Sequence, residues 1–406
     1  MKRILWCSDN PLIPTGYSQV TRNIGMRLKR AGFDFHALGF QQFSMPIDEV
    51  KTQVGWIEFP IKPTMRFAEN YGDKGSIEFW VETLKPHITV FLSDSFMIRH
   101  LITPRIRDVV IERTIDKLKT LTSLWMYYPF DSADVYEGAA ELLSEMHTRI
   151  AMSKFGQRLL KKKAGLDSFY IPHGVDTLVY RPLPEGVINE IKKRHNIDGK
   201  FIIGSVFRNQ TRKLPTKLLK AFKLFAEDKK DVLLLLHTDA QDPQGQNLND
   251  FIDKRIKLDR SKVKFTGMNF ISGVSNHEVN LLYNVMDIHA LSTTGEGFGL
   301  PIIESHAAGT PNVITDYTTS RELLDDGRFG QLVKVKEFIE GQMNTSRAIV
   351  DVEHMADCFE KYYNKPNLVK KHGKLAREFT IEHYNWEKVL RMWIELIQFG
   401  EIYERA

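Results

Sequence analysis

The chain has 406 residues, of which 42% are hydrophobic and 26% charged, and its formal net charge is +5. This length exceeds a single hydrophobic core and favours two domains, while the near-average composition indicates a chain that is folded nearly throughout. The sequence contains no run of the roughly 20 apolar residues that span a bilayer, and its two cysteines exclude a disulfide framework.

The amino-terminal stretch Met1 to Cys7 places two basic residues before a short apolar run, Ile4-Leu-Trp-Cys7. That run is too short for a signal peptide, so we expect a cytoplasmic location. Cys7 and Cys358 are far apart in sequence, and we expect both to be buried free thiols.

In the first half of the chain, apolar runs rich in β-forming residues alternate with segments of helical period. Strands are predicted at 4–7, 33–38, 88–92, 123–128 and 149–153, with a helix at 20–30. The alternation is typical of a doubly wound parallel sheet.

The alternation of strand-like and helical segments is interrupted by the proline-containing segment 178–197 and then continues. Strands are predicted at 201–206, 232–236, 263–266, 287–291 and 311–315, with a helix at 215–228. We therefore predict an α/β fold of two Rossmann-like domains, 1–180 and 181–385, that face a cleft. The amphipathic helix predicted at 386–406 either caps the second domain or packs back on the first.

The segment 287–315 reads as strand, glycine loop, helix and strand. Gly295, Gly297 and Gly299 can adopt positive φ, and Pro301 suits a first helical turn, so a helix is predicted to begin at about Leu300. The free N–H groups at such a start attract an anion, most commonly a diphosphate.

Two carboxylates, Glu296 and Glu304, frame this helix start with seven residues between them. Carboxylates accept charge-assisted hydrogen bonds from polyols. The helix dipole alone can explain Glu304, but Glu296 would be repelled by a phosphate unless it reaches a neutral hydroxylated group such as a sugar.

The sequence Glu296-Gly-Phe-Gly-Leu-Pro-Ile-Ile-Glu304, with the following Ala307-Ala-Gly-Thr-Pro311, resembles the E-x7-E motif of the family 4 retaining glycosyltransferases, which have the GT-B fold. The resemblance implies that Glu296 contacts the donor sugar hydroxyls and that Glu304 binds the ribose. It also implies that donor sugar or phosphate meets the backbone of Gly297, Phe298, Gly299 and Leu300.

Arg208 and Lys213 follow the strand 201–206 in one loop. Taken alone they read as solvated charges, but beside the Glu pair they resemble the family's cations that neutralise the departing diphosphate. Arg212 competes with Lys213 for this role. Gly16, after the first strand, resembles the family's glycine loop that faces the diphosphate.

The sequence departs from the family after the strand 123–128, where many relatives carry a His toward the acceptor and this chain has Tyr127-Tyr-Pro-Phe-Asp131. Asp131 either contacts a sugar hydroxyl or ends the strand. Asp94 is the other candidate. His173 lies in a segment that resembles the family's domain crossing, and we interpret it as structural.

The resemblance implies a metal-independent retaining transfer of a hexose or similar sugar from a nucleotide-diphosphate sugar, UDP- or GDP-linked, without a bound cofactor. The hydroxyl acceptor would be a glycan, a lipid-linked sugar or a small molecule. The sequence lacks a DxD in a strand-end loop of the kind that holds a metal-bound diphosphate.

Three alternatives stay open. A dinucleotide-dependent oxidoreductase would need a G-x-G-x-x-G after an early strand, which is missing here. A non-catalytic nucleotide-sugar sensor would use the same donor residues. The net positive charge also fits contact with a lipid surface or with nucleic acid that carries an acceptor base. Such a base could stack on aromatic side chains in or beside the loops of the first domain, namely Tyr17, Phe96, Tyr127, Tyr128 and Phe130. Core packing, however, explains most of these rings.

Overall fold

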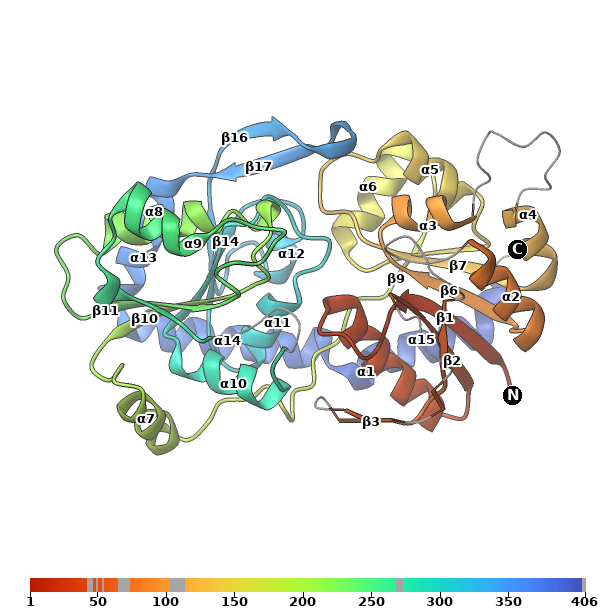
Figure 1. Cartoon of the computed structure of the whole chain (residues 1–406), viewed down its shortest axis with the longest axis horizontal. Coiled ribbons are helices and arrows are strands. Elements are labelled where there is room, and N and C mark those ends of the chain that lie inside the picture. The colour runs from red at the N-terminus through yellow and green to blue at the C-terminus, as the bar shows by residue number, and fades with distance from the viewer. Residues whose placement is uncertain are drawn as a thin grey trace. The chain divides into compact units, whose positions relative to one another are not determined.

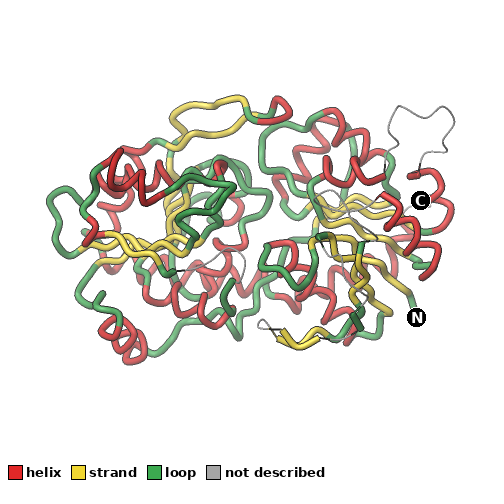
Figure 2. The backbone as a smooth tube through the Cα atoms, in the orientation of Figure 1, coloured by secondary structure: helices red, strands yellow, loops and turns green. Residues whose placement is uncertain are grey.

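The computed structural model describes residues 1–41, 47–48, 50–52, 55–64, 74–102, 114–267 and 273–403. The chain divides into two compact units. The first comprises residues 1–130, 134–173 and 386–406, and the second comprises residues 131–133 and 174–385. Each unit is an α/β structure built on a parallel sheet (Figures 1 and 2).

The first unit contains, in its described residues, a seven-stranded sheet of order β5-β2-β1-β6-β7-β8-β9, and all of its neighbouring strands are parallel. Its strands are β1 (Arg3–Asp9), β2 (Asp34–Phe40), β5 (Ile61–Pro63), β6 (Ile88–Leu92), β7 (Ser123–Tyr128), β8 (Thr148–Ala151) and β9 (Phe169–Tyr170). A separate antiparallel pair joins β3 (Val50–Thr52) and β4 (Gly55–Ile57). Its helices are α1 (Gly16–Arg30), α2 (Lys74–Leu84), α3 (Ser95–Ile102), α4 (Thr114–Leu121), α5 (Glu137–Ser144), α6 (Lys154–Ala164) and α15 (Trp386–Tyr403).

The second unit contains, within the described ranges, a six-stranded parallel sheet of order β12-β11-β10-β13-β14-β15. Its strands are β10 (Phe201–Val206), β11 (Val232–His237), β12 (Val263–Phe265), β13 (Ile288–Leu291), β14 (Asn312–Thr315) and β15 (Gln331–Val333). An antiparallel hairpin, β16 (Val335–Glu340) and β17 (Ser346–Val350), follows the sheet. The helices are α7 (Glu185–Arg194), α8 (Pro215–Phe225), α9 (Leu248–Asp250), α10 (Asn276–Val285), α11 (Leu300–Ala307), α12 (Ser320–Leu323), α13 (Val352–Tyr363) and α14 (Pro366–Tyr384).

The apolar runs form strands because helices cover both faces of each sheet. All five residues of β6 and all six of β11 are buried, as expected for central parallel strands. In the second unit, α8 packs against α13, and α11 packs against α14 and α10 (Figure 1). The prediction of two doubly wound parallel sheets is confirmed, and the bounds predicted for β6, β7 and β10 agree with the structure.

The carboxyl-terminal helix α15 belongs to the first unit, where it packs beside α1. Trp393 inserts between two aromatic side chains of the first sheet, with ring centroids 5.2 Å from Trp6 and 5.1 Å from Tyr127. The main change of unit along the chain falls between His173 and Gly174, whereas the sequence placed the boundary at residue 180.

Both cysteines, Cys7 in β1 and Cys358 in α13, are free and buried, which confirms the prediction for these thiols. Burial raises the pKa of Cys358 to about 11, so the thiol is protonated at neutral pH. Across the described ranges, every helix falls short of the length and apolar character needed to cross a membrane.

Replacing Trp393 by Ala should destabilise the first unit by about 3–5 kcal/mol, because it opens a cavity beside the rings of Trp6 and Tyr127. Urea unfolding followed by tryptophan fluorescence measures this change. Phe399→Ala on the same helix is the matched control, since Phe399 is 50% exposed and Trp393 only 1%. Equal losses of stability for the two variants would contradict the packing described for α15.

Candidate functional site

The candidate site of the second unit lies where the strand order of its sheet reverses. The order β12-β11-β10-β13-β14-β15 switches direction between β10 and β13, which pair side by side. In open α/β sheets, ligands bind beyond the carboxyl ends of the strands at this switch point. The segment 207–214 follows β10 and the segment 292–299 follows β13, so the two sequence motifs meet at one place.

Lys213 and Glu296 form a buried ion pair at this switch point. The Lys213 Nζ lies 2.5 Å from Glu296 Oε1, and the two side chains are only 11% and 7% exposed. Arg212 adds a second cation, with Nη1 3.6 Å from Glu296 Oε2. The Thr318 hydroxyl accepts a hydrogen bond from the Glu296 N–H and donates one to the Glu296 carbonyl, at 3.0 Å each, and so fixes the Glu296 backbone.

The pKa values of both members of this pair lie below their usual values, for different reasons. Burial raises the pKa of Glu296, but the Lys213 and Arg212 charges outweigh burial and hold the pKa below its usual value. Burial and the neighbouring Arg212 charge lower the pKa of Lys213 to about 8, against the opposing effect of Glu296 and Asp131. Glu296 is therefore ionised at neutral pH, and Lys213 loses its proton within an accessible pH range.

Two of the three glycines in the loop before α11 have the positive φ that the sequence allows. Gly295 has φ 154° and Gly299 has φ 111°, whereas the φ of Gly297 is not positive. The helix α11 begins at Leu300 with Pro301 in its first turn, as predicted. Phe298 is buried, with its ring centroid 5.8 Å from that of Tyr384.

Glu304 lies on α11 and is buried, and its Oε2 accepts a hydrogen bond of 3.0 Å from the Tyr283 hydroxyl. Burial, with the Glu304 charge, raises the pKa of Tyr283 well above its usual value, so this hydroxyl stays a donor. The structure therefore fixes the Glu304 carboxylate through a neighbour on α10. The sequence did not point to Tyr283.

Arg208 lies in the same loop as Lys213, but its guanidinium Nε donates to Asp242 Oδ2 at 2.8 Å. The Asp242 side chain is fully buried in the loop that follows β11, and the Arg208 side chain is 37% exposed. Arg208 is thus held by a neighbouring loop, whereas Arg212 and Lys213 face Glu296.

Asp131 requires a correction. Asp131 falls within the predicted first domain, 1–180, whereas the structure groups residues 131–133 with the second unit. The reason is a contact that the sequence did not reveal: Arg347 of β17 lies 2.8 Å from Asp131 Oδ2 and donates to the Asp131 carbonyl at 3.0 Å. A Cβ at Gly295 would lie 1.9 Å from that carbonyl oxygen, so Asp131 and the glycine loop meet backbone to backbone.

Gly16, Asp94 and His173 belong to the first unit. Gly16 begins α1, next to the N-cap residue Thr15. The Tyr17 hydroxyl donates to Asp94 Oδ1 at 3.2 Å. His173 is buried against the Tyr127 hydroxyl, 2.7 Å from Nδ1, and burial lowers its pKa to about 3, so it is neutral.

The aromatic residues considered for stacking divide by burial. Tyr127, Tyr128 and Phe130 are at most 6% exposed and pack in the core of the first unit, while Phe96 is 40% exposed. Among the described residues, the structure shows no group of three or more His, Cys, Asp or Glu side chains arranged to hold a metal ion.

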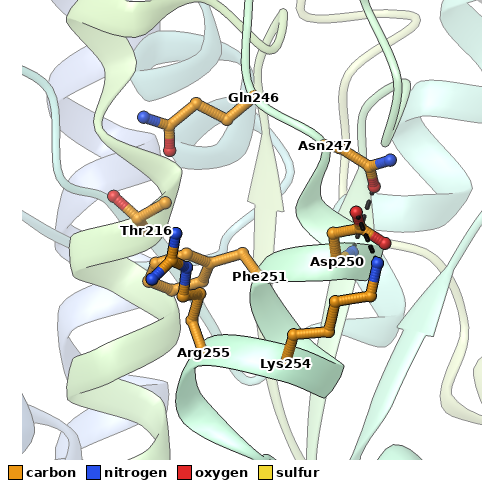
Figure 3. A pocket seen from close by; sticks show the side chains of 7 residues that line it. All are labelled: Thr216, Gln246, Asn247, Asp250, Phe251, Lys254 and Arg255. Atoms are coloured by element: carbon orange, nitrogen blue, oxygen red, sulfur yellow. Dashed lines mark hydrogen bonds and ion pairs between the residues drawn. The ribbon is translucent and has the colours of Figure 1, made fainter.

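A surface pocket of about 480 Å³ lies beside the loop that holds Arg208. Its lining residues are Thr216, Gln246, Asn247, Asp250, Phe251, Lys254 and Arg255 (Figure 3). Lys254 pairs with Asp250 at 2.9 Å, and the Asn209 amide donates to the Gln246 carbonyl at 2.8 Å. The pocket therefore adjoins the 207–214 segment but contains neither carboxylate of the E-x7-E pattern.

Residues 187–362 match the family model of the group 1 glycosyl transferases. This range contains Arg208, Arg212, Lys213, Glu296 and Glu304. The chain is 28% identical to mannosylfructose-phosphate synthase of Agrobacterium fabrum over 36% of this chain and 32% of that protein. It is 27% identical to phosphatidyl-myo-inositol mannosyltransferase of Mycobacterium tuberculosis over 50% of this chain and 49% of that protein. The matched region thus spans a third to a half of these curated relatives.

Solved structures match over nearly the whole chain. Sucrose-phosphate synthase from Thermosynechococcus elongatus superposes with a TM-score of 0.74 at 16% identity, covering 100% of this chain and 99% of that one. HepE of Anabaena in complex with UDP gives a TM-score of 0.71 at 15% identity, covering 98% and 100%. The fold is therefore that of the GT-B glycosyltransferases, with two Rossmann-like α/β units.

Replacing Gly295 by Ala should lower the free energy of unfolding more than replacing Gly327 by Ala. Both glycines have positive φ, so each variant carries a backbone strain of about 1–2 kcal/mol. The nearest atom to an added Cβ at Gly327 is 3.6 Å away, but at Gly295 it is the Asp131 carbonyl oxygen at 1.9 Å. This overlap should add about 1–3 kcal/mol.

Chemical denaturation of the two glycine variants measures the difference. Equal losses of stability would show that residues 131–133 do not lie against the glycine loop.

Proposed function

We propose that this protein is a glycosyltransferase that moves a hexose or similar sugar from a nucleotide-diphosphate sugar to a hydroxyl acceptor. The observation that carries the proposal is the buried Lys213–Glu296 pair at the switch point of the second sheet. The match of residues 187–362 to the group 1 glycosyl transferases supports it independently.

The proposed donor site uses both members of the pair. The donor diphosphate would take hydrogen bonds from Lys213, Arg212 and Arg208 and from the N–H groups at the start of α11. Glu296, which accepts a hydrogen bond from Lys213, would also accept hydrogen bonds from the sugar hydroxyls. Glu304, oriented by Tyr283, would bind the ribose. The role of Gly16 toward a diphosphate stays a prediction from the family resemblance.

We propose a retaining front-face displacement. The bond between the anomeric carbon and the diphosphate oxygen breaks, and the acceptor oxygen bonds to the anomeric carbon on the same face. The acceptor proton passes to the departing diphosphate oxygen. Lys213 and Arg208 stabilise the negative charge that develops on this leaving group, the role that a bound metal ion has in other transferases.

The proposed acceptor is a hydroxyl group of a glycan, a lipid-linked sugar or a small molecule. The names of some similar proteins contain a lipid, among them the phosphatidyl-myo-inositol mannosyltransferase and an alpha-monoglucosyldiacylglycerol synthase of Streptococcus pneumoniae. Asp131 or Asp94 is proposed to meet the acceptor or the sugar. The cytoplasmic location stays a prediction, as does contact with a lipid surface or nucleic acid.

A thermal-stability panel of UDP-, GDP-, ADP- and CMP-sugars tests the donor site. One donor at 100 times its Kd should stabilise the protein by about 2.7 kcal/mol. UDP-glucose is the first choice, because structures of HepE contain UDP and UDP-glucose. Glu296→Gln keeps the shape of the side chain without its charge and should weaken the stabilisation by a sugar nucleotide more than that by the free nucleotide.

Release of nucleoside diphosphate separates the enzyme from its alternatives. Stabilisation by a donor with no release, with or without acceptors, would support a nucleotide-sugar sensor. If none of the sugar nucleotides in the panel raised the thermal stability of the protein, the proposed function would be contradicted.

Donor affinity should decrease as the pH rises through about 8, because Lys213 loses the proton that attracts the diphosphate. A hydrogen bond from a charged group contributes about 1.5–3 kcal/mol, so full deprotonation should raise the donor Kd by about tenfold or more. Isothermal titration from pH 7 to pH 9.5 measures the effect.

Lys213→Arg keeps its charge over this range, and its Kd should stay nearly constant with pH. If the Kd of the wild-type protein and of Lys213→Arg rose in parallel, the titrating group would not be Lys213.

A further inference from the structure

The β16–β17 hairpin attaches residues 131–133 to the glycine loop. Arg347 of β17 contacts both the carboxylate and the carbonyl of Asp131. The Tyr317 hydroxyl accepts from the Ala133 N–H and donates to the Ser346 carbonyl, at 2.8 Å each. We call residues 131–133 the clip.

The hairpin also bonds directly to the loop that follows β13. The Ala348 N–H donates to the Thr294 carbonyl at 3.2 Å, and the Phe338 ring lies 5.4 Å from that of Tyr317. Gly295 leaves no room for a side chain beside the Asp131 carbonyl. The hairpin, the clip and the glycine loop therefore form one connected structure next to Glu296.

The clip brings a second carboxylate close to Lys213. The Asp131 charge acts on Lys213 and opposes the effect of burial on its pKa. Lys213 and Arg212 already face Glu296, so an unpaired Asp131 would balance the remaining positive charge and repel a diphosphate. Arg347, only 19% exposed, supplies the compensating charge.

We propose that Arg347 is a positioning residue of the donor site: it neutralises Asp131 and holds the clip against the glycine loop, so that Lys213 and Arg212 keep a net attraction for the donor diphosphate. This inference rests on the proposed function. It assigns a role to a residue outside the E-x7-E pattern and to a hairpin outside the parallel sheet.

The test measures Kd values for UDP and GDP by isothermal titration. Arg347→Ala should weaken binding of the nucleotide that the wild-type protein prefers by about tenfold, because Asp131 then stands unpaired near the diphosphate. The double variant Arg347→Ala/Asp131→Asn removes the unpaired charge and should return to within about threefold of the wild-type Kd. Arg347→Lys should retain most of the affinity.

A matched control is Arg260→Ala, which removes an exposed Arg that pairs with Asp253 at 2.7 Å in the same unit and should leave the Kd unchanged. If Arg347→Ala does not fold, Arg347→Gln with and without Asp131→Asn provides the same comparison. Thermal unfolding of each variant confirms that it is folded during the titration.

An unchanged Kd in Arg347→Ala would overturn the inference. A double variant that binds as weakly as the single one would also overturn it, because a purely structural role of Arg347 is not rescued by removing a charge. If the wild-type protein binds neither UDP nor GDP and turns over no donor, the proposed function fails first, and the two failures are thereby distinguished.

Discussion

The segments that follow β10 and β13 in the second unit meet at one buried ion pair, Lys213 with Glu296. Each charge would be strongly unfavourable in this position without the other, since neither side chain is more than 11% exposed. The pair joins the segments that follow β10 and β13, and so it holds the two motifs at the switch point of the sheet. The Glu296 carboxylate lies opposite Lys213 because its backbone is fixed by the Thr318 contacts, between the turn at Gly295 and the start of α11.

Those parts of the fold that depend on local chemistry could be predicted from the sequence. Central strands such as β6 and β11 are buried on both faces and therefore appear as continuous apolar runs. The start of α11 follows from Pro301 and the preceding glycines. Glu296 and Lys213 were both identified, but their direct contact was not, because residues 83 positions apart leave no periodic signal.

The position of Asp131 could not be predicted for the same reason. Its partner Arg347 lies 216 positions further along the chain, on a hairpin that the sequence analysis did not identify. The short β-rich runs on either side of Gly341 were the available signal. The family match covers residues 187–362, so it includes the proposed donor residues of the second unit and leaves all of the first unit outside. Diphosphate and ribose are constant chemical groups, so the residues proposed to bind them follow a recognisable pattern, whereas acceptors vary in chemistry.

The return of α15 to the first unit has a consequence for biosynthesis. A ribosome makes the chain from its amino terminus, so Trp6 and Tyr127 are synthesised long before Trp393, the ring that covers them. The second unit, by contrast, is almost continuous in sequence, from Gly174 to Asn385. Domains generally fold as units, in order of synthesis. The aromatic core of the first unit therefore stays incomplete until α15 has been synthesised, after all of the second unit.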